Sequence, residues 1–358
     1  MPTPVRYSPA VETPAEDEAE ISAGINAALR EILETTARDY GHAVRSVHAK
    51  SHGIFEGVLT LADHLPRELA QGIAARPGAH PVIMRLSTNP GDILPDDITV
   101  PRGVALRIFE VDGEMLPSAE GLPAQDFIMV NGPAFNAKDT KPFLASLKLL
   151  AKTTDRMERS KKLISAMFRG AETVLEAVGL ESATLKALGG QPATHPLGDS
   201  FFTQTAYRYG DYIAKLSLAP VSPQLLDLHD KKIDIGDRPD ALREEIDAVI
   251  AAKGGEWELR VQLCTDLDKM PVEDASVEWD QAQSPFRAIG RVVVPPQPGR
   301  SAEMARRVDD GMGFSPWQGL AAHQPLGVVN RARRSAYPMS AAFRAAFNGC
   351  PVMGQTRG

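Results

Sequence analysis

The stretch of the sequence with the most chemical potential is Arg331–Arg344, which reads RARRSAYPMSAAFR and surrounds one tyrosine, Tyr337, with four arginines. A tyrosine side chain is normally neutral at pH 7, because its pKa lies near about 10. Arg333 lies four residues before Tyr337, a spacing that puts two side chains on one helical face, and a fixed cation beside a phenol favours the phenolate. A phenolate is a ligand for ferric iron, as in tyrosinate-ligated haem. The alternative is a solvated basic helix with a tyrosine on its apolar side.

Three other places in the sequence carry groups that could act together with such a tyrosine. His48 stands in RSVHAKS directly before a predicted strand, and Arg85 and Ser87 alternate in RLS, so that they share one strand face. Asn131 ends a later predicted strand. The alternatives are a structural histidine and a turn-forming Asn-Gly pair. His48 and His52 have a metal-like spacing, but no acidic residue completes a HExxH-like site, so we do not expect zinc.

The composition is that of an acidic globular protein without a disulfide framework. Of the 358 residues 43% are hydrophobic and 24% are charged, and the net charge of −7 argues against binding to nucleic acid. Two cysteines, Cys264 and Cys350, are too few for a disulfide scaffold, which favours a reducing, cytoplasmic compartment. The sequence has no apolar stretch of membrane-spanning length and no signal-peptide pattern. We expect residues 1–20 to be a flexible acidic tail.

The elements that must position these residues are mainly strands joined by short turns. A helix is predicted at Ala23–Tyr40, a helical insertion at Thr140–Gly189 (with helices at Lys141–Leu150, Arg159–Phe168 and Glu172–Val178), and further helices beyond Arg300. Eight strands are predicted in two groups of four: Gly53–Asp63, Pro81–Thr88, Gly103–Val111, Asp126–Asn131, Phe201–Tyr209, Tyr212–Ala219, Trp257–Thr265 and Phe286–Val294. The pattern lacks βαβ alternation and predicts an α+β fold, with an antiparallel sheet that eight strands can close into a barrel. We expect residues 21–358 to form a single domain.

Several segments, in order along the chain, resemble those of catalases. VHAKSHGIFEG resembles the distal-histidine segment, RLST the arginine-serine strand that follows it, and PRGVALRIFEVDGE the next strand. QDFIMVNGPAFNAKD resembles the distal-asparagine segment, while WELRVQLCTDLDKMPVEDASVEWD and FRAIGRVVV resemble the last barrel strands. RRSAYPMSAAFR carries the RxxxY motif of the proximal ligand. The resemblance covers most of the chain, from His48 to Arg344, and implies a catalase-like eight-stranded barrel that binds haem b.

The resemblance also implies roles for individual residues. Tyr337 would be the axial ligand of the haem iron, and Arg333 would hold it as the phenolate. His48 would be the distal acid–base, oriented by a hydrogen bond to Ser87, with Asn131 as the second catalytic group of the distal side. The other implied cofactor-binding residues are Arg45, Arg85 and Arg344 for the haem propionates, Val47 at the channel mouth, Phe135 and Phe143 in the distal pocket, and Phe314 beside the haem.

Two features depart from the pattern of the large catalases. An alignment without gaps on Pro133 puts Val130, not Asn131, at the position of the catalytic asparagine, although a one-residue bulge would return Asn131 to the pocket. In addition, Asn136 replaces a phenylalanine that follows the proline. The chain is also shorter, with less sequence before the distal segment, which implies a shorter and wider approach to the haem.

These features together favour a small catalase-related haem peroxidase. We expect it to cleave hydrogen peroxide or organic hydroperoxides through a high-valent oxo-iron intermediate, with a small reducing co-substrate. The alternatives are a fatty-acid hydroperoxide isomerase or lyase on the same fold, an ordinary catalase, and a haem-binding or storage protein without turnover. The resemblance also implies a homo-oligomer.

Overall fold

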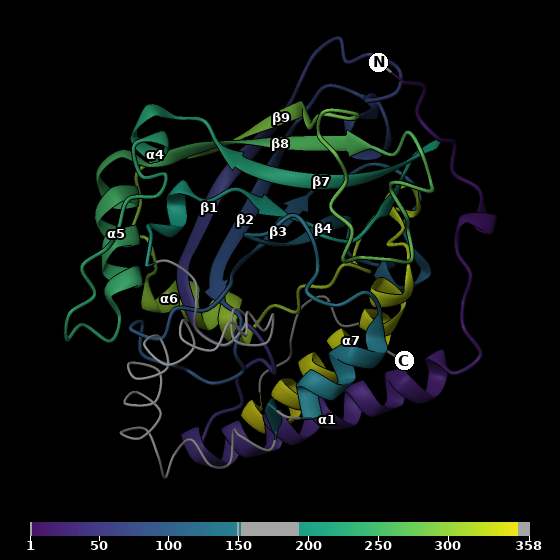
Figure 1. Cartoon of the computed structure of the whole chain (residues 1–358). Helices are drawn as coiled ribbons and strands as arrows, with labels where there is room; N and C mark the ends of the chain where they lie inside the picture. The colour runs from purple at the N-terminus through teal and green to yellow at the C-terminus, as the bar shows by residue number, and fades with distance from the viewer. Residues whose placement is uncertain (1, 149, 152–192, 350–358) are drawn as a thin grey trace, which may run out of the picture.

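The computed structural model describes residues 2–148, 150–151 and 193–349, and its centre is a closed antiparallel barrel (Figure 1). The strands are hydrogen-bonded in the order β5-β4-β3-β2-β1-β9-β8-β7, and β5 also pairs with β7, which closes a ring of eight; β6 is added beside β7. The predicted eight-stranded barrel is therefore confirmed. The strands are β1 Ser51–Leu61, β2 Ala79–Thr88, β3 Arg102–Phe109, β4 Ala124–Val130, β5 Phe201–Phe202, β6 Tyr207–Tyr209, β7 Tyr212–Pro220, β8 Gly255–Leu263 and β9 Arg287–Val294.

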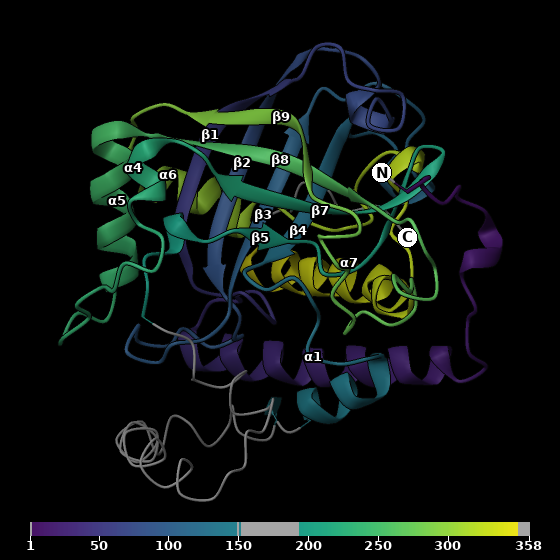
Figure 2. The same cartoon turned by 45° about the horizontal axis from the view of Figure 1, so that its top comes forward.

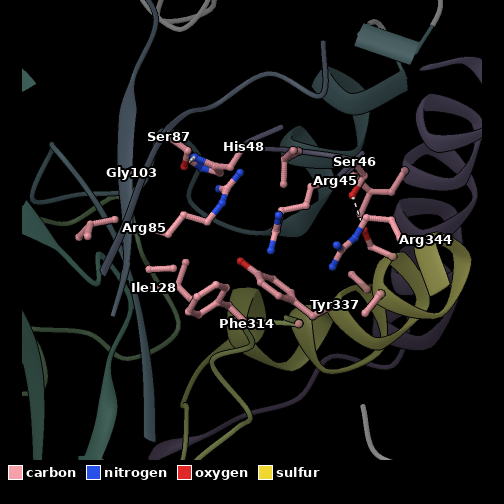
Figure 3. Close-up of a pocket in the computed structure, with 18 of the residues that line it drawn as sticks. Arg45, Ser46, His48, Arg85, Ser87, Gly103, Ile128, Phe314, Tyr337 and Arg344 are labelled. Atoms are coloured by element: carbon pink, nitrogen blue, oxygen red, sulfur yellow. Dashed lines mark hydrogen bonds between the residues drawn. The ribbon is translucent and has the colours of Figure 1, made fainter. Parts of the chain in front are cut away.

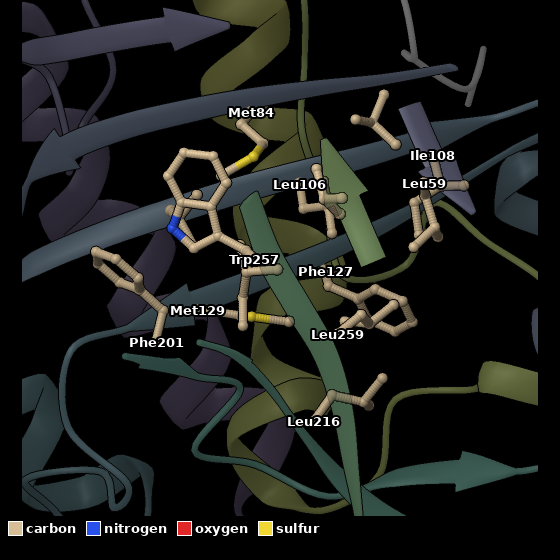
Figure 4. Close-up of a cluster of buried hydrophobic side chains, with 14 of the residues drawn as sticks. Leu59, Met84, Leu106, Ile108, Phe127, Met129, Phe201, Leu216, Trp257 and Leu259 are labelled. Carbon is tan, nitrogen blue, oxygen red and sulfur yellow. The ribbon is translucent and has the colours of Figure 1, made fainter. Parts of the chain in front are cut away.

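Alternation along each strand separates the barrel interior from its outer face. In β2, Met84 and Leu86 belong to the main apolar cluster, while Ile83 belongs to a second cluster on the other side of the sheet. Figure 4 shows the interior filled by side chains such as Trp257 and Phe127, both of which are buried. The barrel is thus a packed core, and room for a ligand must lie outside it.

Helices cover the outside of the barrel and supply the second wall of the site. The long helices α1 and α7 run side by side under the barrel in both views (Figures 1 and 2). Ile25 and Leu29 of α1 pack against Ala332 and Ala336 of α7, whose small side chains let the two helices approach closely. The helices are α1 Glu18–Tyr40, α4 Pro223–Leu226, α5 Ala241–Lys253, α6 Ala302–Met304 and α7 Val328–Asn348, with a π-helical segment, η5, at Ala305–Asp310. Short 3-10 turns are η1 Pro9–Val11, η2 Gly72–Ala75, η3 Pro117–Ala119, η4 Pro196–Gly198 and η6 Ala321–His323.

Most predicted elements are present, with two corrections. The helix predicted to end before Gly41 does end at Tyr40, where Gly41 has a left-handed conformation with φ 63°. The single strand predicted at Phe201–Tyr209 is wrong, because Gln204 has φ 59° and its amide donates to the carbonyls of Gly132 and Ala134, which breaks the strand into β5 and β6. Helix α5 was not predicted at all.

The predicted helical insertion is described only at its start. Residues 140–148 are helical, in agreement with the first predicted helix of the insertion. The helices predicted at Arg159–Phe168 and Glu172–Val178 lie outside the described residues. Among the described helices, none has the length and apolar character needed to cross a membrane.

The segment predicted to be a flexible acidic tail makes specific contacts. The backbone N–H of Val5 donates to the Cys264 carbonyl and that of Tyr7 to the Asp211 carbonyl, each at 2.8 Å. Further along, Glu12 and Glu18 both bind Arg331 of α7. This segment therefore lies along the barrel in the structure, and the division of the chain at residue 20 stays a prediction.

Candidate functional site

A cavity lies between the outer face of the barrel and helix α7, and it brings together residues from distant parts of the chain (Figure 3). Its empty space, including the open solvent at its mouth, is about 700 Å³. Strands β2, β3 and β4 supply one wall and α7 the opposite one. The lining residues include Arg45, Val47, His48, Arg85, Ser87, Gly103, Ala105, Ile128, Phe314, Tyr337 and Arg344.

Tyr337 forms the helical wall of the cavity. Figure 3 shows its hydroxyl directed from α7 into the space below His48 and Arg85. Arg333 lies one turn earlier in the same helix, as predicted, and its guanidinium donates to the Asn330 side-chain oxygen at 3.2 Å and to the Thr205 hydroxyl at 3.5 Å. Asn330 is fully buried, and its hydrogen bond therefore fixes the position of the Arg333 guanidinium.

The other two arginines of the same stretch have structural partners instead. Arg331 binds three carboxylates, those of Glu12, Glu18 and Glu273, at 2.6–2.9 Å. Arg334 lies over the ring of Trp317, with 5.0 Å between its guanidinium carbon and the ring centroid. These two residues therefore attach α7 to the surrounding chain and do not belong to the cavity.

His48 faces the cavity from the loop before β1, and its ring is tightly positioned. Its Nδ1 lies 3.1 Å from the Ser87 hydroxyl oxygen, which is the hydrogen bond that the resemblance implied. The backbone at His48 has φ 54°, a left-handed conformation that is uncommon for a residue with a side chain and that clusters at functional sites. Burial, and then the charges of Arg85, Arg333 and Arg45, lower the pKa of His48 to about 3. The imidazole is therefore neutral at physiological pH.

The depressed pKa of His48 predicts an unusual pH profile. A histidine with an ordinary pKa of about 6.5 loses its basic form on acidification to pH 5, whereas a pKa of about 3 keeps it neutral throughout this range. We expect the part of peroxide cleavage that depends on His48 to be constant from pH 5 to pH 8. The rate difference between wild type and a His48→Ala variant measures this part, and a sigmoidal loss centred near about pH 6.5 would contradict it.

Gly103 of β3 makes room for the His48 ring. A Cβ atom at this position would lie 2.5 Å from His48 Cε1 and 2.9 Å from Nδ1, so no side chain fits while His48 keeps its place. We expect Gly103→Ala to displace the imidazole from Ser87 and to slow peroxide cleavage about 100-fold while haem binding is kept. Gly132→Ala is the matched control, since its new Cβ would meet only Gln204 Nε2 at 3.8 Å. Equal activity of both variants would show that Gly103 does not position His48.

Arg45, Arg85 and Arg344, which we call the arginine cradle, line one end of the cavity. Arg85 donates from Nε to a carboxylate oxygen of Asp309 at 2.7 Å. The guanidiniums of Arg45 and Arg344 donate to backbone carbonyls at the end of η5, at 2.6–3.2 Å for the closest contacts. Burial, followed by the charges of the other two arginines, lowers the pKa of Arg45. Positive charge is thus concentrated where an anionic ligand group could reach it.

The residues of the cavity fit a haem in three respects. The Arg344 Nε–H is buried and has no acceptor among the described residues, so it can donate a hydrogen bond to a ligand oxygen. Among the described residues, the arginine cradle carries three positive charges against one contacting carboxylate, Asp309, and a surplus of this kind suits the two propionates of haem b. Tyr337 faces the cavity from α7 and His48 faces it from the loop before β1, so Tyr337 could hold the iron of a haem and leave His48 to act as a base.

Four of the predicted site residues do not line the cavity: Arg333, whose contacts are given above, and Asn131, Phe135 and Phe143. Asn131 accepts from the Arg102 backbone N–H at 3.0 Å and donates to Asp199 at 3.1 Å, and the pairing of β3 with β4 runs in regular register up to Val130. Phe135 and Phe143 pack against each other with 5.3 Å between ring centroids. A catalytic role for Asn131 stays a prediction, and it requires the amide to leave both partners.

Sequence reasoning missed two groups of residues around the cavity. Gly103 and Asp309 have no signal in the local sequence, because each acts on a side chain far away in the chain. Arg107 and Asp126 form a fully buried pair, with bonds of 2.7 and 2.6 Å, and Asp126 also accepts from the Ser315 backbone N–H at 2.9 Å. Since Arg107 also lies 5.0 Å from the Phe314 ring, this pair holds Phe314 against the cavity. The sequence does carry one signal for this pair, because Arg107 is an arginine in a strand that is otherwise rich in apolar residues.

Comparisons with known proteins agree in structure but not in sequence. The sequence matches no family model and no curated protein. A fungal catalase matches with a TM-score of 0.59 at 18% identity, over 88% of this chain and 62% of the catalase. Catalase A from Saccharomyces cerevisiae matches at 0.58 and 15% identity, over 88% and 64%, and a bacterial catalase at 0.56 and 17% identity, over 99% and 66%. The chain thus spans 62–66% of the length of these three catalases. It has the fold of these catalases.

Proposed function

We propose that this protein is a haem-dependent enzyme that cleaves hydroperoxides, working mainly as a peroxidase with a small reducing co-substrate. The observation that carries the proposal is the opposition of Tyr337 and His48 across one cavity whose end is formed by the arginine cradle. The shared fold with catalases supports chemistry on peroxide. In this proposal Tyr337 holds the iron, and Arg45, Arg85 and Arg344 hold the propionates.

When bound, the haem supplies redox chemistry at iron, which cleaves the peroxide O–O bond. His48 supplies the proton transfer. In the tautomer that donates its Nδ1–H to the Ser87 hydroxyl, the Nε2 lone pair can take a proton from the inner peroxide oxygen and return it to the outer one. Its low pKa keeps this nitrogen unprotonated in the resting enzyme.

The wall of the cavity around His48 favours substrates with a carbon chain. Apart from His48, Ser87 and Arg85, the strands on this side contribute the apolar side chains of Ala105 and Ile128, which lie on the outer face of the barrel. Such a wall binds alkyl groups by the hydrophobic effect and gives no polar contact to a small peroxide. The same observation favours the second candidate, a hydroperoxide isomerase or lyase, which would rearrange its substrate without any reductant.

The proposal extends to the surroundings of the protein. A cytoplasmic location is supported by the presence of only two cysteines in 358 residues. Assembly as a homo-oligomer is proposed by analogy with the family, and size-exclusion chromatography with light scattering measures it directly.

Two measurements on the purified protein test the function. The absorption spectrum after reconstitution with haem should be that of a ferric haem with a tyrosinate ligand, and a protein that takes up no haem would end the proposal. Oxygen release from hydrogen peroxide is then compared with oxidation of a dye by hydrogen peroxide and by an alkyl hydroperoxide. Faster dye oxidation supports a peroxidase, fast oxygen release alone indicates an ordinary catalase, and consumption of a fatty-acid hydroperoxide without any dye indicates an isomerase or lyase.

A further inference from the structure

Asp309 carries a role that the haem site by itself does not require. We propose that Asp309 is an internal counterion of the arginine cradle, which keeps the cavity folded before an anionic ligand arrives. The proposal rests on the proposed function only for the identity of that ligand, since the contacts of Asp309 lie within the chain itself.

The contacts of Asp309 are those of a charge centre. One carboxylate oxygen accepts from Arg85 Nε at 2.7 Å and lies 3.5 Å from Arg45 Nη1. The other accepts from the Ser51 hydroxyl at 2.7 Å and from Arg300 Nη2 at 3.1 Å. Burial alone would raise the pKa of Asp309, but the guanidiniums of Arg85 and Arg45 hold it well below its usual value. The carboxylate is therefore charged, and it is the shared partner of Arg45, Arg85 and Arg300.

The position of Asp309 leaves the cavity open to a ligand. Arg45, Arg85 and Arg344 line the cavity, whereas Asp309 is not among its lining residues. The carboxylate thus contacts the guanidiniums from behind, and a ligand anion would contact them from the front. Because Arg85 is only 2% exposed and Arg45 is mostly buried, neither can turn to water when it lacks a counterion.

This arrangement makes Asp309 and the ligand carboxylates partly redundant. Removing one partner of a buried ion pair leaves an uncompensated buried charge, which strongly destabilises the folded state. A ligand that brings its own carboxylates to the same guanidiniums supplies part of the missing compensation. Neutralising Asp309 should therefore destabilise the ligand-free protein more than the ligand-bound one, and by linkage it should increase the thermal stabilisation that the ligand gives.

The experiment compares Asp309→Asn with the control Asp310→Asn, which also removes one carboxylate charge. Asp310 is the next residue in the chain, and its carboxylate binds His42 near the surface. Without ligand, we expect the Tm of Asp309→Asn to fall by about 5–10 °C and that of Asp310→Asn by less than about 2 °C. Saturating haem should restore more than half of the Tm that Asp309→Asn has lost relative to the wild type. Haem dimethyl ester, whose carboxylates are blocked, should recover none of it. Equal Tm values for the two variants, or equal recovery with both haems, would overturn the proposal.

A second variant decides the case in which Asp309→Asn does not fold. If the role is charge compensation, Arg85→Gln combined with Asp309→Asn removes the cation together with its counterion and should yield folded protein. Failure of the double variant to fold would instead assign Asp309 a structural role unrelated to charge. Failure of this proposal can be distinguished from failure of the proposed function. If the wild type bound no haem, the haem site would be refuted, but the Tm comparison without ligand would still test the role of Asp309.

Discussion

Replacement of Tyr337 by phenylalanine is expected to remove the ferric haem spectrum of the wild type and to weaken haem retention at least about tenfold. The phenolic oxygen points from α7 into the cavity, and a phenylalanine ring keeps the packing of the helix while it removes this oxygen. Changes to groups that only orient a metal ligand already cost roughly 10–100-fold in affinity, so loss of the ligand itself should cost no less. Titration of the ligand-free protein with haem, followed by absorption spectroscopy, measures both effects.

Tyr40→Phe is the control for this substitution. Tyr40 ends α1, and its hydroxyl binds Asp92 on the surface, away from the cavity. The control should keep the spectrum and the affinity for haem. If Tyr337→Phe kept both as well, Tyr337 would not be the axial ligand, and the tyrosine would be an apolar-face residue of a basic helix after all.

Replacement of His48 by alanine should leave haem binding intact and slow peroxide cleavage by about 10²–10⁴-fold, the usual contribution of a general acid–base. The imidazole is a neutral base of the cavity wall, and within the described part of the chain its ring hydrogen bond goes to Ser87 and not to the arginine cradle. Stopped-flow mixing of the haem-loaded protein with an alkyl hydroperoxide measures the step directly.

His48→Gln separates proton transfer from positioning. Glutamine can bind Ser87 through its amide, but it cannot accept and return a proton at neutral pH. We expect it to be as slow as His48→Ala, while His229→Ala, at an exposed histidine, should match the wild type. A glutamine variant with wild-type rates would mean that His48 only shapes the cavity.

The sequence contained the local part of this site because local spacing controls it. The interval between Arg333 and Tyr337 is one helical turn, and α7 places both side chains accordingly. Arg85 and Ser87 are two residues apart in a strand, so they share the face that forms the cavity wall. The alternating apolar pattern likewise predicted the barrel, since a strand with one face in the core must alternate.

The position of Asn131 shows where local spacing is insufficient. Its spacing to Pro133 admits two registers, and the choice between them depends on how β4 pairs with β3 and on the partners Arg102 and Asp199. Those partners come from other segments, so the sequence around Asn131 holds no information about them. The same holds for Gln204, whose bonds to a distant loop break the strand that its neighbours predict.

The sequence itself, through periodicities of a few residues, indicated the helical spacing of Arg333 and Tyr337 and the shared strand face of Arg85 and Ser87. Only the tertiary structure decided that Gly103 shapes the place of His48 and that Asp309 pairs with Arg45 and Arg85. The physical reason is that steric exclusion and charge compensation act through space at a few ångströms. Their partners here are separated by tens to hundreds of residues along the chain, and no periodic pattern connects them.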